Sequence, residues 1–212
     1  MGQYYKVVNL DKKEHLHPHA FGDGLKLLEF GMSSRGTLTG LTILLADGNN
    51  RGGGDLLVDE SNPICRDFVG RWAGDRIVIA GDYADKGRFI SDKDDLTGLE
   101  DDDGKPATAK DVNLYVLAAE KFRDVSPETL YCILQDGYIL KEIKGELKKG
   151  EGVFSNRELL KDIILLIDTK DPKDFPAVLP DLTTDGGKQI WEVLVKGTVR
   201  KSRTRSPSGS RV

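Results

Sequence analysis

The sequence predicts an α+β (or α/β) fold, a single compact domain with a small central sheet covered by helices. Segments rich in β-branched and aromatic residues are typical of strands, and they lie at Tyr4–Leu10, Arg76–Ala80 and Tyr138–Ile143. Apolar residues at helical spacing predict helices over residues 37–46, 111–122, 127–135 and 156–168. The two kinds of segment together favour a sheet with helices packed on it.

Length and composition limit the class of protein. The chain has 212 residues, 38% of them hydrophobic and 31% charged. A domain of this size buries about 70% of its unfolded surface, so it needs no disulfide or metal to fold. The two cysteines are too few for a secreted disulfide scaffold. The longest apolar run, Ile163–Ile167, is too short to cross a bilayer. We therefore expect a soluble cytoplasmic protein without a membrane partner.

Charge is distributed unevenly along the chain. Residues 91–110 are strongly acidic with little apolar content, which predicts an exposed insertion in a globular domain over residues 1–197. Residues 198–212 hold five basic residues and no acidic one. This pattern predicts a disordered basic tail that makes weak contacts with nucleic acid or acts as a nuclear address. A purely solubilising tail is the alternative.

A motif follows the apolar run that ends at Ala80. The heptapeptide Gly81–Gly87, GDYADKG, resembles the GD-x-x-D-R-G motif of the calcineurin-like metallophosphatases. The resemblance implies that Asp82 bridges two metal ions and that Asp85 takes part in phosphoester hydrolysis. It covers seven residues only, Lys86 replaces the arginine of the family, and the other histidine-containing motifs of that family are missing. The alternative is a turn in which Asp82 caps local amides.

Three histidines occupy five positions near the N-terminus. His15, His17 and His19 would point to one side if this segment were extended, and Pro18 favours an extended backbone at the residue before it. Three imidazoles on one side predict a site for a divalent metal such as Zn²⁺, with Asp82 as a further ligand if the fold brings it close. The alternative is a surface loop with one packed histidine.

A glycine run offers a possible anion site. Gly52, Gly53 and Gly54 could form a nest of backbone amides that binds a phosphate. No Gly-Lys-Ser/Thr follows them, so the run is not a P-loop. A flexible loop is the alternative.

Two hypotheses about function follow from these patterns. In the first, the protein is a binding or regulatory protein with a protein partner, because no complete catalytic constellation is present. In the second, it is a metal-dependent hydrolase, most plausibly a phosphoesterase, that uses Asp82, Asp85 and the histidines. The second hypothesis requires the segment His15–His19 to lie near Asp82 in space.

Overall fold

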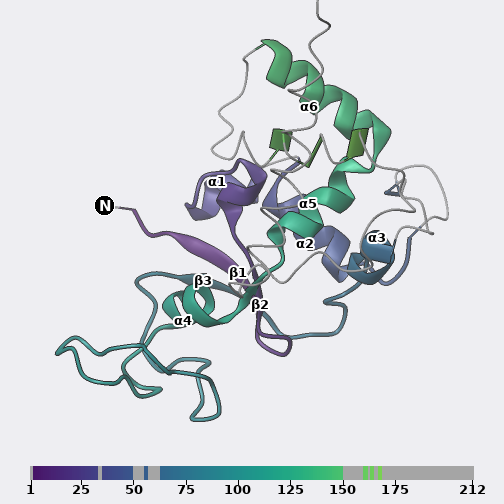
Figure 1. Ribbon diagram of the computed structural model, residues 1–212. Helices are drawn as coiled ribbons and strands as arrows, with labels where there is room; N and C mark the ends of the chain where they lie inside the picture. Colours follow the sequence, from purple (N-terminus) through teal and green to yellow (C-terminus); the bar gives the residue numbers. More distant parts are fainter. Residues whose placement is uncertain are drawn as a thin grey trace, which may run out of the picture.

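The computed structural model describes residues 2–32, 35–49, 55–56, 63–149, 160–161, 163–164 and 167–168 (Figure 1). Its strands are β1 (Tyr5–Asn9), β2 (Glu14–Leu16), β3 (Ile77–Gly81) and β4 (Arg123–Asp124). Its helices are α1 (Leu27–Gly31), α2 (Thr37–Leu45), α3 (Pro63–Phe68), α4 (Leu114–Lys121), α5 (Ser126–Leu134) and α6 (Gly137–Lys149), with a 3₁₀ helix η1 at Pro18–Phe21. Together they form the compact α+β domain that the sequence predicts.

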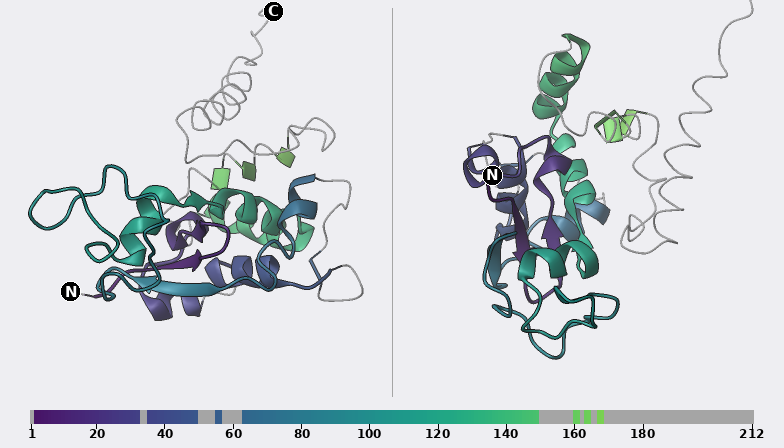
Figure 2. Two further views of the ribbon diagram at one scale, coloured as in Figure 1. Left: turned by 90° about the horizontal axis from the view of Figure 1, so that it is seen from below. Right: turned by 90° about the vertical axis from the view of Figure 1, so that its left-hand side faces the viewer.

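The sheet has the strand order β3-β1-β2-β4. Strand β1 pairs antiparallel with both β2 and β3, and β2 pairs in parallel with β4. Strand β3 therefore lies at one edge, as Figure 2 (left) shows. Because side chains alternate between the two faces of a strand, β1 presents Val7 to one face of the sheet and Val8 to the other.

Each face of the sheet has its own hydrophobic core. Val7 and Leu16 belong to a large cluster built with residues of α1, α2, α3 and α5. Val8 and Ala80 belong to a smaller cluster with residues of α4. Burial on both sides explains why the central strand is apolar along most of its length.

Helix α5 is the most deeply buried helix, with every residue from Ser126 to Leu134 buried. Proline at its start costs nothing, because the first amides of a helix have no partner within the helix. Helix α4 starts at an N-cap, since the side chain of Asn113 accepts a hydrogen bond from the amide of Val116.

The structure confirms the predicted strands at Tyr4–Leu10 and Arg76–Ala80 as β1 and β3, within a residue at either end. It also confirms the predicted helices over residues 37–46, 111–122 and 127–135 as α2, α4 and α5, although α4 begins three residues later, at Leu114. Of the predicted helix over 156–168, the described residues are helical, and Leu160 and Ile163 are buried.

The predicted strand at Tyr138–Ile143 is wrong, because this segment begins α6. The Asp136 carboxylate accepts hydrogen bonds from the amides of Tyr138 and Ile139, which is how an N-cap residue starts a helix. Ile139, Leu140, Ile143 and Leu147 all pack on the larger core at helical spacing. The helix then continues to Lys149.

The acidic insertion over residues 91–110 extends from the face that carries α4 (Figure 1). Most of its acidic side chains are exposed, but Leu96, Leu99 and Ala107 pack against the smaller core. The side chain of Asp94 is only 4% exposed and pairs with Lys13 at 2.5 Å. The basic tail, residues 198–212, lies outside the described residues. None of the helices within the described ranges is long and apolar enough to cross a membrane.

Candidate functional site

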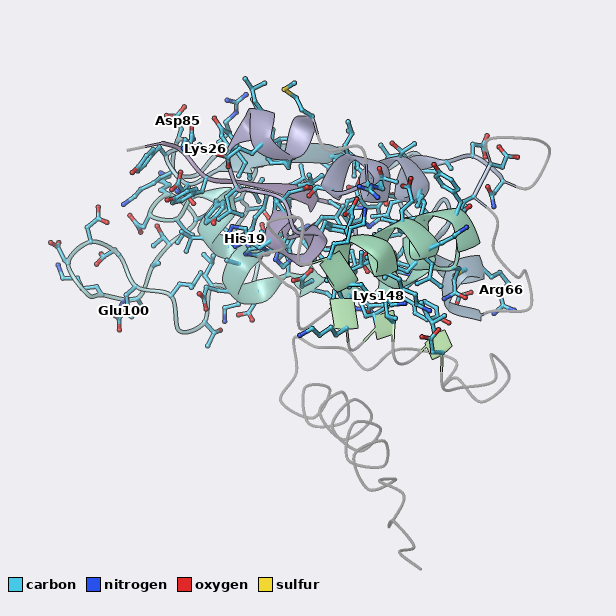
Figure 3. All side chains as sticks on the ribbon, turned by 90° about the horizontal axis from the view of Figure 1, so that it is seen from above. His19, Lys26, Arg66, Asp85, Glu100 and Lys148 are labelled. Carbon is cyan, nitrogen blue, oxygen red and sulfur yellow. The ribbon has the colours of Figure 1, made fainter. Side chains whose placement is uncertain are left out.

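The predicted catalytic aspartates lie just beyond the end of β3. The Asp82 carboxylate accepts a hydrogen bond from the amide of Tyr4 at 3.0 Å, and the Asn113 side chain donates to the Asp82 carbonyl at 2.7 Å. Asp85 is exposed, and Figure 3 shows it well apart from His19. Lys86 forms an ion pair with Asp102 at 2.7 Å. The Asp82 carboxylate thus holds the amide of Tyr4 beside the neighbouring strand β1, which is not the local amide that the turn alternative predicts.

The three histidines are not on one extended segment. His15 lies in β2, and His17 has an extended backbone, with φ −102° and ψ 113°. The chain then turns into η1 at Pro18, since proline suits the first position of a helical turn. His19 consequently leaves the line of the strand, although its ring centroid remains 5.4 Å from that of His17. The expected alternation holds for His15 and His17 but not for His19.

A buried lysine, Lys6, lies beside this histidine segment. Lys6 is buried on the face of the sheet that α4 covers, and its Nζ lies 3.3 Å from His15 Nε2. His15 Nδ1 lies 3.2 Å from the carbonyl oxygen of Arg123. Because a carbonyl only accepts, Nδ1 carries the proton and Nε2 accepts from the ammonium of Lys6. The Lys6 ammonium also lies 5.4 Å from the ring centre of Tyr115.

We call Lys6, His15, His17, Tyr115 and Asp124 the Lys6 cluster, and burial shifts the pKa values of its lysine and its two histidines. Burial lowers the pKa of Lys6, while the charges of Asp124 and Glu120 act in the opposite direction. Burial likewise lowers the pKa of His15, and it lowers that of His17 to about 4. Both imidazoles are therefore neutral at pH 7, which is the state that tolerates a lysine ammonium alongside.

The arrangement leaves little room for a metal ion at His15. Both ring nitrogens have partners, and the cation beside them is the side chain of Lys6 itself. Within the described part of the chain, no group of three or more His, Cys, Asp or Glu side chains is placed to hold a metal ion. A ligand role for His15 would require its hydrogen bonds to Lys6 and Arg123 to break.

We expect the purified, untagged protein to contain substoichiometric metal, because a bound divalent cation would lie beside the Lys6 ammonium and be repelled by it. The metal content is measured by elemental analysis of the wild type and of a variant with His15, His17 and His19 all changed to Ala. Near-stoichiometric metal that disappears in the variant would show that the histidines bind metal.

The predicted phosphate nest, Gly52, Gly53 and Gly54, lies outside the described residues. A hollow of about 390 Å³ is lined by residues on both sides of this run, including Asn49, Asp55 and Asp136. The Asn49 side chain is held by the backbone of Leu56, to which it donates at 2.8 Å and from which it accepts at 3.0 Å. Two carboxylates on its lining make this hollow unfavourable for a phosphate.

Sequence reasoning missed a second buried polar cluster, on the opposite face of the sheet. The Glu14 carboxylate accepts three hydrogen bonds from the Arg71 guanidinium, at 2.5, 2.9 and 3.1 Å, and one from Trp72 Nε1 at 2.8 Å. Beside it, Arg123 donates to Glu128 at 2.7 Å. No local signal in the sequence marks this cluster, because the strand that holds Glu14 has only three residues and is not predicted. These contacts join β2, β4, α5 and the segment after α3, so the cluster stabilises the fold.

The third candidate is an apolar hollow between β3 and the helices α1 and α2. It has a volume of about 200 Å³. We call it the β3 groove and define it by the exposed apolar residues on its lining: Leu27, Leu28, Met32, Leu38 and Ile79. Leu28 is 71% exposed and Met32 is 80% exposed. Single exposed apolar side chains are ordinary, but five around one hollow are typical of a docking surface.

Some backbone amides and carbonyls of β3 do not bond to β1 and lie beside the β3 groove. The amides of Leu10 and Asp82 donate to the carbonyls of Arg76 and Tyr4, which fixes the pairs Leu10–Arg76 and Tyr4–Asp82 as hydrogen-bonded. Since such pairs alternate along an antiparallel ladder, Val78 and Ala80 bond to β1, whereas Ile77 and Ile79 point their amides and carbonyls away from it. No described residue pairs with these outward groups in a further strand.

Comparison of the chain with models of known protein families, with curated proteins and with solved structures gave no match. The case for a function therefore depends on the geometry alone.

Proposed function

We propose that the protein is a non-catalytic binding or regulatory protein that docks another polypeptide at the β3 groove. The observation that carries the proposal is the position of the outward backbone groups of Ile77 and Ile79 beside exposed apolar side chains of α1 and α2. An extended chain complements both features, since its backbone satisfies the strand edge and its side chains fill the hollow. We propose the cytoplasm as the compartment, where both cysteines would stay reduced.

Binding accounts for the exposed side chains better than catalysis does. A buried site would place convergent polar groups in a hollow, whereas the lining of the β3 groove is almost entirely apolar. Within the Lys6 cluster, Lys6 bonds to His15, whose other ring nitrogen bonds to the Arg123 carbonyl, and the ammonium lies against Tyr115 of α4. The phosphoesterase remains the second hypothesis, and the metal analysis described above tests it.

Selection from a random peptide library displayed on phage tests the docking function. We expect the wild type to enrich peptides with apolar residues at alternate positions, because alternate side chains of a docked strand face the groove. A variant with Leu28→Glu and Met32→Glu should enrich none of them, because it puts two carboxylates where apolar side chains would pack.

The matched control is Tyr138→Glu, which places a carboxylate at an apolar position that is also 71% exposed but lies on α6. This variant should enrich the same peptides as the wild type. Enrichment of no peptide by the wild type, or equal enrichment by the groove variant, would contradict the proposal.

A further inference from the structure

We infer that the first occupant of the β3 groove is a second copy of this chain, which pairs its own β3 with the free edge to form a symmetric dimer. The inference rests on the proposed function, because it takes the groove to be a protein-docking surface and names the partner. The class of contact is the addition of one edge strand to another, which continues the sheet across two molecules.

The geometry of the edge suits self-pairing. Antiparallel pairing of two identical strands is related by a two-fold axis perpendicular to the sheet, so each contact occurs twice. Centred on Val78, this pairing sets Ile77 of one copy against Ile79 of the other, and their outward amides and carbonyls bond in both directions. The strand IVIAG has no charged side chain, so like charges do not oppose this pairing.

The same two-fold axis brings the two grooves together. Ile79 and Val7 are partners in the ladder, and both line the hollow with residues of α1 and α2. An axis perpendicular to the sheet keeps both copies on the same face, so α1 of one copy approaches α1 of the other above the joined strands. Leu28 and Met32 would then be covered by their counterparts, which accounts for an exposure that nothing in the described part of the chain explains.

A dimer of this kind must also meet requirements of interface area and charge. A stable interface covers about 800 Å² on each partner, more than the hollow alone offers, so the strand edge and α1 must contribute together. The charges nearest the groove on α1, Lys26 and Glu29, compensate each other at 3.8 Å. This pair therefore adds no net charge that would repel a second copy.

Sedimentation-equilibrium ultracentrifugation of the full chain tests the inference. We expect a monomer–dimer equilibrium for the wild type and dissociation constants at least about tenfold higher for Ile79→Lys, because two lysines meet near the axis and charges on an edge strand oppose pairing. Leu28→Glu with Met32→Glu should weaken the dimer as much, and these helix-surface positions leave the sheet intact. Val116→Lys, at a position on α4 that is 40% exposed against 46% for Ile79, should not change it.

The outcomes separate the dimer from the docking function. A monomer at all concentrations, together with peptides that bind the groove, overturns the dimer and leaves docking supported. A dimer that persists in both groove variants also overturns the inference, because it must use another surface. A dimer weakened by both groove variants and unchanged by Val116→Lys supports it.

Discussion

Replacing Glu14 with alanine should lower the free energy of unfolding by about 3–5 kcal/mol, the range typical when one partner of a buried ion pair is removed. Glu14 is buried, with only 3% of its surface exposed, and its carboxylate holds both the Arg71 guanidinium and Trp72 Nε1. Without it, the indole N–H has no acceptor and Arg71 loses its partner. Urea denaturation followed by tryptophan fluorescence measures the loss.

Asp103→Ala is the matched control for the effect of Glu14→Ala on the free energy of unfolding. Its carboxylate lies 3.6 Å from Lys105 on the exposed insertion, with both side chains largely in solvent. An ion pair of that kind contributes about 0–1 kcal/mol, so the control should be nearly neutral. If Glu14→Ala also cost less than about 1 kcal/mol, the buried cluster would not be an important source of stability.

Glu128→Gln should remove a large part of the dependence of stability on pH. Glu128 is almost fully buried, and burial raises its pKa to about 7 despite the opposing charge of Arg123. Its second oxygen, Oε2, has no hydrogen-bond partner among the described residues. The folded state therefore binds a proton that the unfolded state, with an ordinary carboxyl pKa near 4.5, releases over the intervening pH range.

The sign of the effect follows from this raised pKa. The contribution of Glu128 to stability is complete below about pH 4.5 and is lost as the pH rises through about 7, a change of roughly 3 kcal/mol. The variant cannot titrate, so its stability relative to the wild type should rise by about that amount from pH 4.5 to pH 8. Taking the difference cancels the contributions of His15 and His17, whose lowered pKa values act with the opposite sign. Parallel pH profiles for the two proteins would contradict this account.

Local sequence signals predict the elements whose pattern is independent of the rest of the chain. The β-branched runs of β1 and β3 and the apolar spacing of α2, α4 and α5 are of this kind. Strands β2 and β4 have three and two residues, so their formation depends on pairing with neighbours rather than on propensity. The start of α6 depends on a cap by Asp136, and a run of Tyr, Ile and Leu after it is typical of a strand as well as of a helix.

In the candidate sites, too, the sequence indicates single residues, whereas the contacts between them depend on the tertiary fold. The sequence draws attention to His15 and His17, and the structure confirms that both continue the line of β2. It does not reveal that Lys6 contacts both His15 and Tyr115 of α4, because the contact with His15 depends on the register of β1 with β2. The β3 groove joins α1 to Ile79 across a long interval of sequence, so only the tertiary fold brings its residues together.

Amide hydrogen exchange at β3, resolved by NMR, tests most directly whether a chain docks on this edge. The amides of Val78 and Ala80 bond to β1 and provide an internal reference that should exchange slowly in every sample. We predict that the outward amides of Ile77 and Ile79 exchange slowly in concentrated wild type, or with a selected peptide bound, and rapidly in the Leu28→Glu, Met32→Glu variant. Rapid exchange of Ile77 and Ile79 in the wild type under both conditions would contradict the docking function.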